Sequence, residues 1–126
     1  MKNIVLDSSA ILAVMLQEKG SEVVEPLLDG GKVSTVNIAE TFSKLAEKGR
    51  LTDSTVEDFL QLGLEIIDFD YEQAVKTAEL RPLTKHLGMS LGDRSCLALA
   101  ILQGATAVTA DKDWKSLSFC PIEVIR

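Results

Sequence analysis

The chain has 126 residues, of which 46% are hydrophobic and 25% are charged, and its formal net charge at pH 7 is −6. This length and composition fit one globular domain with its own core and exclude a disordered chain. Because proteins that bind nucleic acid over a broad face carry an excess of Lys and Arg, the negative charge argues against that mode of binding. It is compatible with a site that gathers carboxylates around a cation.

The sequence has no features typical of membrane or secreted proteins. No apolar run approaches the roughly 18 residues of a membrane span, and the first residues, MKNIVLD, lack a signal-peptide cleavage site. The two cysteines, Cys96 and Cys120, have no metal-binding or redox spacing. We therefore expect a soluble cytoplasmic protein with free thiols, of which Cys96 is buried.

Strand-like runs alternate with helical patterns from the start of the chain. We expect Ser8 or Ser9 to cap the first helix and Gly20 to end it. Pro26 falls in the second predicted helix, where a proline is allowed only at a kink or near the start. The first half predicts, in order, a strand over 3–6, helices over 8–20 and 21–31, a strand over 32–36 and a helix over 37–49.

The second half continues the alternation. A moderate cap signal at Thr52 starts a helix, and Pro82 favours a break or bend in the helix that precedes it, near Arg81. The predicted elements are a helix over 52–64, a strand over 65–69, helices over 70–81 and 90–102, a strand over 105–110, a turn or short helix over 111–117 and a strand over 121–125. Strands separated by helices predict an α/β fold with a parallel sheet covered on both faces.

Four acidic residues fall at the carboxyl edge of this predicted sheet. Asp7 and Asp111 directly follow strands, while Glu40 and Asp93 lie in or near the first turns of helices. Ligands of open α/β sheets bind at this edge. Crowded carboxylates repel one another unless a cation compensates, and Mg²⁺ and Mn²⁺ prefer oxygen ligands. The placement therefore predicts a divalent-metal site suited to phosphodiester hydrolysis.

Each of these acids also has a purely structural interpretation. Asp93 completes an S-x-x-D capping box, and Glu40 can form a solvated ion pair with Lys44 one turn along its helix. Asp7 can cap the helix that follows it, and Asp111 can be a turn residue. The meeting of all four at one edge favours the functional interpretation.

Other chemistries fit less well. His86 is the only histidine, and we expect it to be exposed, with no Ser or Cys nucleophile beside it. No Gly-rich phosphate loop is present. A phosphoacceptor domain with Asp7 as acceptor remains an alternative, although DSSA lacks the second acid of aspartyl-phosphate phosphatases.

Four segments occur in a recognisable order: IVLDSSAILAVML, VNIAETFSKL, SLGDRSCLALA and AVTADKDW. Together they resemble the motifs of PIN-domain ribonucleases, and most closely those of the VapC-type toxins of bacterial toxin–antitoxin pairs. The resemblance covers essentially the whole chain, so we expect residues 1–126 to form a single PIN domain. It implies a three-layer α/β/α fold with a mainly parallel central sheet.

The resemblance also implies an activity and its residues. It implies endonucleolytic cleavage of RNA, often tRNA or rRNA, that depends on one or two Mg²⁺ or Mn²⁺ ions. By motif position, the four acids of the family fall on Asp7, Glu40, Asp93 and Asp111, with Asp113 as the alternative for the fourth place. Relatives are homodimers held inactive by an antitoxin whose C-terminal segment fills the active-site groove.

Further residues are candidates for supporting roles. Ser9 and Thr109 match positions that support the acids through hydrogen bonds, while Arg94 can contact a phosphate or pair with an acid of its own domain. Because the chain is acidic, any RNA-binding surface must be local. The candidates for it, which can equally form a solvated helix face, are Lys76, Arg81, Lys85, His86 and Arg94. The alternative function is a catalytically weak PIN-like binding module that acts through a protein partner.

Overall fold

The computed structural model of the chain describes residues 3–126, in which five strands form one sheet of order β3-β2-β1-β4-β5. Every pairing between these strands is parallel. The strands are β1 (Ile4–Leu6), β2 (Lys32–Ser34), β3 (Glu65–Ile67), β4 (Thr106–Thr109) and β5 (Ile122–Val124). The predicted α/β class is confirmed, with a sheet that is parallel throughout.

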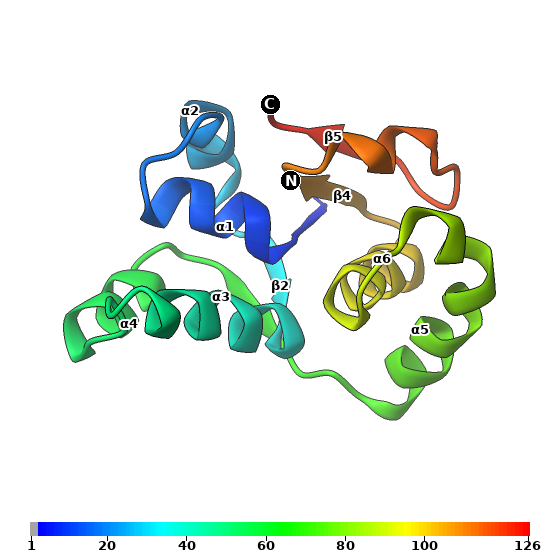
Figure 1. Ribbon diagram of the computed structural model, residues 1–126, viewed down its shortest axis with the longest axis horizontal. Helices are drawn as coiled ribbons and strands as arrows, with labels where there is room; N and C mark the ends of the chain where they lie inside the picture. The colour runs from blue at the N-terminus through cyan, green and yellow to red at the C-terminus, as the bar shows by residue number, and fades with distance from the viewer. Residues whose placement is uncertain (1–2) are drawn as a thin grey trace.

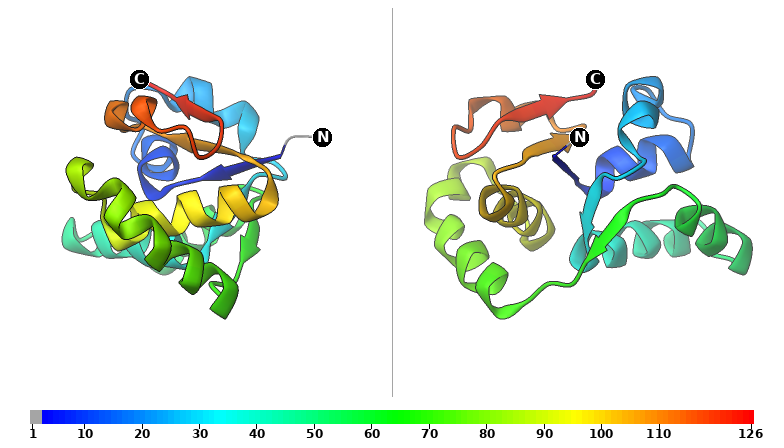
Figure 2. Two further views of the ribbon diagram at one scale, coloured as in Figure 1. Left: turned by 90° about the vertical axis from the view of Figure 1, so that its right-hand side faces the viewer. Right: turned by 180° about the vertical axis from the view of Figure 1, so that it is seen from behind.

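Helices cover both faces of the sheet, as parallel strands require. They are α1 (Ser8–Met15), α2 (Ser21–Val24), α3 (Thr35–Glu47), α4 (Asp53–Leu60), α5 (Tyr71–Thr84) and α6 (Leu91–Gln103). Three short 3₁₀ helices complete the chain: η1 (Glu25–Leu27), η2 (Lys85–Leu87) and η3 (Lys112–Ser116). Figure 1 shows α1 to α4 on one side of the sheet and α5 and α6 on the other, and the view from behind in Figure 2 shows the same three layers.

The central strand β1 explains why the core divides between the two faces. Side chains alternate along a strand, so Ile4 and Leu6 enter the cluster under α1 and α2, while Val5 enters the cluster under α6. All three are buried, and full burial of one such side chain is worth roughly 1.5–3 kcal/mol. This packing fixes the end of β1, and with it the position of the next residue, Asp7.

Several predicted boundaries change in the structure. Helix α1 is capped by Asp7 rather than by Ser8 or Ser9, and it ends at Met15 rather than near Gly20. The chain leaves the helix because Gln17 takes a positive φ of 55°. The predicted helix over 21–31 is only the single turn of α2 followed by η1, which contains Pro26.

Pro82 does not end α5, which continues to Thr84. A proline within a helix removes one backbone hydrogen bond, and here the loss falls in the last turn. The hydroxyl of Thr84 donates to the carbonyl of Leu80 at 2.8 Å, which ties this last turn together.

Other expectations concern the surroundings of single residues. Cys96 is buried, Cys120 is half-buried, and both are free thiols. His86 is exposed, as predicted. Among the helices of residues 3–126, none combines the length and apolarity of a membrane span.

Candidate active site

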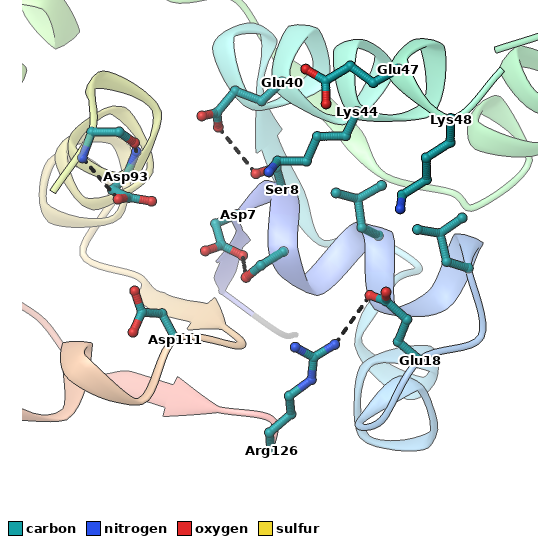
Figure 3. A pocket seen from close by; sticks show the side chains of 14 residues that line it. Asp7, Ser8, Glu18, Glu40, Lys44, Glu47, Lys48, Asp93, Asp111 and Arg126 are labelled. Atoms are coloured by element: carbon teal, nitrogen blue, oxygen red, sulfur yellow. Dashed lines mark hydrogen bonds and ion pairs between the residues drawn. The ribbon is translucent and has the colours of Figure 1, made fainter. Parts of the chain in front are cut away.

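A pocket of about 570 Å³ opens where the strands end, and the four predicted acids all line it. Asp7 follows β1, Glu40 lies on α3, Asp93 lies in the first turn of α6, and Asp111 follows β4. Figure 3 shows these four side chains around the same opening. Segments that are far apart in the sequence thus supply one group of carboxylates.

Asp7 is the buried member of this group, with 3% of its surface exposed. Its Oδ1 accepts hydrogen bonds from the hydroxyl of Ser9 at 2.7 Å and from the backbone N–H of Ala10 at 2.9 Å. Its Oδ2 accepts a 2.6 Å hydrogen bond from the hydroxyl of Thr109. One carboxylate therefore caps α1 and is held in place by α1 and by the last residue of β4.

Burial raises the pKa of Asp7 to about 6, because the charged form loses its hydration. The hydrogen bonds from Thr109, Ser9 and Ala10 oppose this rise, while the negative charge of Asp93 adds to it. At neutral pH the carboxylate is ionised, although no side chain of residues 3–126 forms an ion pair with it. A bound cation would compensate this charge.

Asp93 is held by the capping box predicted from the sequence. The backbone N–H of Ser90 donates to Asp93 Oδ2 at 3.0 Å, and the backbone N–H of Asp93 donates to the hydroxyl of Ser90 at 3.2 Å. Both residues also line the pocket. The structural interpretation and the functional one are therefore compatible, because the cap aims the carboxylate.

Glu40 is held in place by its neighbours and does not form the predicted ion pair with Lys44. Its Oε1 accepts hydrogen bonds from the amide of Asn37 at 2.8 Å and from the hydroxyl of Ser8 at 3.2 Å. Within residues 3–126 the ion pairs are Lys76–Glu79 and Arg126–Glu18. The expected solvated pair is thus replaced by contacts toward α1 and α6.

Asn37 and Gly92 decide how closely α3 approaches α6. Asn37 is fully buried, and its amide also donates to the backbone carbonyl of Gly92 at 3.1 Å. A Cβ atom on residue 92 would overlap the carboxylate of Glu40. Gly92 therefore allows the carboxylate of one helix to lie directly against the backbone of the other.

Asp111, rather than Asp113, faces the pocket. Its Oδ1 caps η3 by accepting the backbone N–H of Asp113 at 2.9 Å, and its own N–H donates to the hydroxyl of Thr109 at 3.1 Å. Asp113 is exposed and does not line the pocket. Of the two candidates for the fourth place, Asp111 is therefore the one that lies with the other three acids.

Arg94 does not line the pocket, because its side chain turns to α5. Its Nη1 donates to the backbone carbonyl of Thr77 on α5 at 3.0 Å, and it forms no ion pair with an acid in residues 3–126. Successive residues of a helix project about 100° apart, so Arg94 faces α5 when Asp93 faces the pocket.

The remaining basic candidates are also absent from the pocket wall. They lie on α5 and η2, and the side chain of Lys76 pairs with Glu79 at 3.2 Å. None of the following residues lines the pocket: Lys76, Arg81, Lys85 and His86.

Sequence reasoning missed the residues that position Glu40. Ser8, Asn37 and Gly92 were not predicted to contribute, because a small or polar residue next to an acid is common. The available signal was the N-x-x-E spacing of Asn37 and Glu40, which places both on one helix face, together with the glycine that directly precedes Asp93.

The donor atoms of the pocket fit a hard divalent metal. They are carboxylate and hydroxyl oxygens without His or Cys, which suits Mg²⁺ or Mn²⁺ better than zinc. In the described part of the chain, no three His, Cys, Asp or Glu residues form a ready-made metal cluster. Mg²⁺ keeps several of its waters and needs only one or two carboxylates, so spaced acids are compatible with it.

Comparison with known proteins gives a family and a fold. The sequence model of the PIN domain matches residues 4–119. No curated protein shows a significant sequence match.

Solved structures resemble the chain along nearly its whole length. A chain of VapBC2 from Rickettsia felis, bound to a DNA fragment from its promoter, has a TM-score of 0.78 at 21% identity and 98% coverage of both chains. DNA-bound VapBC from Salmonella typhimurium gives a TM-score of 0.77 at 20% identity, with all of both chains covered. FitAcB from Neisseria gonorrhoeae gives a TM-score of 0.72 at 23% identity, with 94% of this chain and 95% of the other covered.

Proposed function

This chain belongs to the PIN domain family, and we infer that it is a metal-dependent endoribonuclease that folds as a single domain over residues 1–126. The observation that carries this proposal is the pocket lined by Asp7, Glu40, Asp93 and Asp111. Four carboxylates at the carboxyl edge of a parallel sheet form an oxygen-rich site where such folds bind their ligands. The proposed substrate is RNA, of the tRNA or rRNA class.

We further propose that the protein is the toxin of a type II toxin–antitoxin pair. The similar structures from Rickettsia felis and Salmonella typhimurium are both VapBC assemblies, and a similar structure from Klebsiella pneumoniae is a toxin–antitoxin complex. By this proposal the partners are a cognate antitoxin and a second copy of the chain.

The residues of the pocket have different roles in the proposed reaction. Asp7, Asp93, Glu40 and Asp111 would hold one or two Mg²⁺ or Mn²⁺ ions. When bound, such an ion supplies Lewis acidity and charge stabilisation for phosphodiester hydrolysis. Ser9 and Thr109 hold both oxygens of the Asp7 carboxylate in place. This rigidity matters because small displacements of catalytic groups are costly.

The test of this function is Asp93→Asn. The amide oxygen can still accept the N–H of Ser90, so we expect the fold to survive. RNA cleavage with Mg²⁺ or Mn²⁺ should fall by more than the roughly 100-fold that loss of an outer-shell partner costs. Cleavage of total tRNA and rRNA is the assay, and circular dichroism checks the fold.

Asp113→Asn is the matched control, because Asp113 is exposed outside the pocket. It should cleave as the wild type does. A folded Asp93→Asn protein with wild-type activity would remove Asp93 from the proposed site.

The alternative function is a catalytically weak PIN-like binding module that acts through its partner. Calorimetric titration with Mn²⁺ separates the two functions, because only the nuclease requires a metal affinity that is lost in Asp7→Asn and Asp93→Asn.

A further inference from the structure

The pocket extends well beyond the four acids. From Asp7 it continues along α1 past Leu12 to Leu16, the C-cap of that helix. On this side its wall is formed by Lys44 of α3 and by Lys48, the C-cap of α3. In Figure 3 both lysine side chains extend from the α3 side of the pocket toward α1. One end of the pocket therefore carries the four acids. The other end has an apolar floor, and Lys44, Lys48 and Arg126 share it with Glu18 and Glu47.

Neither ammonium group has a partner in residues 3–126. No hydrogen bond or ion pair of Lys44 Nζ or Lys48 Nζ is formed there, although Glu40 and Glu47 lie within one turn of Lys44 on the same helix. Glu40 is unavailable because Asn37 and Ser8 hold its carboxylate.

Arg126, the third cation of the pocket, is already engaged. Its Nη2 lies 3.3 Å from the carboxylate of Glu18, and its Nε donates to the carbonyl of Lys19 at 2.8 Å. Lys44 and Lys48 are therefore the uncommitted positive charges of the pocket wall.

We propose that Lys44 and Lys48 bind backbone phosphates of an RNA strand on one side of the bond that is cut at the acids. This inference rests on the proposed endoribonuclease function and names how its substrate is held. Residues four apart on a helix share one face and are separated by about 6 Å along the axis. That separation is similar to the spacing of neighbouring phosphates in an extended strand.

The charge of the pocket explains why RNA would need the lysine pair as an anchor, that is, as a point where its phosphates are held. Six acidic side chains and three basic ones line it, so its field as a whole repels a polyanion. At the end that carries Lys44 and Lys48, the three cations outnumber the two acids, Glu18 and Glu47, so this is the part of the pocket suited to phosphate. The strand is therefore expected to enter there and to approach the carboxylates along α1.

The lysine pair replaces the surface expected on α5. Lys76 and Lys85 do not line the pocket, and α5 packs with α6 on the opposite side of the sheet from α3 (Figure 1). A strand on α5 would have to pass around α6 to reach the acids.

The test compares two double variants of the full chain. Lys44→Ala/Lys48→Ala removes the proposed anchor, and Lys76→Ala/Lys85→Ala removes the same charge from α5 and η2. Alanine is the best helix former, so both variants should fold. Fluorescence anisotropy with a labelled single-stranded RNA of mixed sequence measures binding across a salt series without divalent metal, and KM and kcat are measured with Mn²⁺.

For Lys44→Ala/Lys48→Ala we expect about ten-fold weaker binding and a similar rise in KM, with kcat and the cleavage pattern unchanged. The slope of log affinity against log salt should shrink by about 1.4, which corresponds to about 0.7 for each lost phosphate contact on a single strand. Lys76→Ala/Lys85→Ala should stay within about two-fold of the wild type in affinity.

The outcomes that overturn the proposal are distinct. Unchanged affinity and salt slope in Lys44→Ala/Lys48→Ala, or a loss confined to Lys76→Ala/Lys85→Ala, removes the lysine pair from the RNA path. A fall in kcat at constant KM also overturns it, because an anchor does not act on the chemical step alone.

Failure of the proposed function gives a different result, namely a wild-type protein that cuts no RNA with Mg²⁺ or Mn²⁺. The anisotropy measurement then still judges the lysine pair by itself. RNA binding that depends on Lys44 and Lys48 supports the anchor, and a wild type that binds no RNA overturns it.

Discussion

At the scale of single residues, Asp7 shows how burial and ionisation oppose each other. Its carboxylate is 3% exposed and accepts three hydrogen bonds, yet its pKa is raised to about 6. Desolvation therefore outweighs the hydrogen bonds that favour the charged form. A residue kept in this state costs folding stability at neutral pH and is suited to receiving a cation.

Asp7→Asn should for this reason stabilise the metal-free protein. The folded pKa of about 6 lies above the ordinary aspartate value of 3.8, so the folded state favours the protonated form. The wild type should lose stability as the pH rises from about 4 to 6, by an amount of up to about 3 kcal/mol. Asp7→Asn cannot ionise at this position, so its stability should not fall in this way as the pH rises.

The hydrogen bonds of the site can accommodate the amide. The hydroxyl of Thr109 can accept from the new N–H group and turn its own hydrogen toward Ser9, 3.3 Å away. Urea unfolding in EDTA across this pH range checks the prediction. Equal pH profiles for the two proteins, or a less stable variant at pH 7, would contradict it.

At the scale of single elements, the start of α6 joins a helix cap to the wall of the pocket. The capping box of Ser90 and Asp93 stabilises the helix end and fixes the turn that presents Asp93 to the pocket. A second capping box, formed by Thr52 and Thr55 at the start of α4, lies outside the pocket. The two capping boxes can therefore be compared, because one lines the pocket and the other does not.

Ser90→Ala should destabilise the protein by about 1 kcal/mol, which is the usual cost of losing a cap. Thr52→Ala should cost a similar amount. Only Ser90→Ala should also slow RNA cleavage, because it loosens the turn that carries Asp93. Thermal unfolding and cleavage rates measured on both variants make the comparison, and an equal effect on cleavage would show that the cap of α6 acts only on stability.

At the scale of the whole molecule, the topology decides where the charges meet. Parallel pairing of β1 with β2 and β4 brings Asp7, the start of α3 and Asp111 to one edge. Helix α6 begins at the same edge because it must cross back before β4. The acids therefore gather without a local sequence motif that joins them.

This gathering predicts that divalent metal stabilises the fold. Mn²⁺ in excess of its dissociation constant should raise the melting temperature of the wild type, since a ligand bound only by the folded state adds stability by mass action. At 100 times the dissociation constant the gain is about 2.7 kcal/mol. Asp7→Asn should show little of this gain, and an equal shift in both proteins would place the metal elsewhere.

Much of this architecture follows from the sequence. The alternation of strands and helices predicts a parallel sheet, and Asp7 and Asp111 are placed at its edge by directly following strands. The buried Cys96 and the exposed His86 also follow from local pattern. These features depend on periodicity and chain order, which neighbours in space do not change.

Only the tertiary structure decides where side chains on helices point. It turns Arg94 toward α5 and directs Glu40 to Asn37 and Ser8 instead of Lys44. Within residues 3–126 it leaves Lys44 and Lys48 at the pocket without a hydrogen bond or ion pair of their ammonium groups. The sequence determined which residues share an element and which edge carries the acids. The packing of α3 against α1 and α6 determined which face of each helix meets the pocket, because helix rotation is set by contacts between segments far apart in the chain.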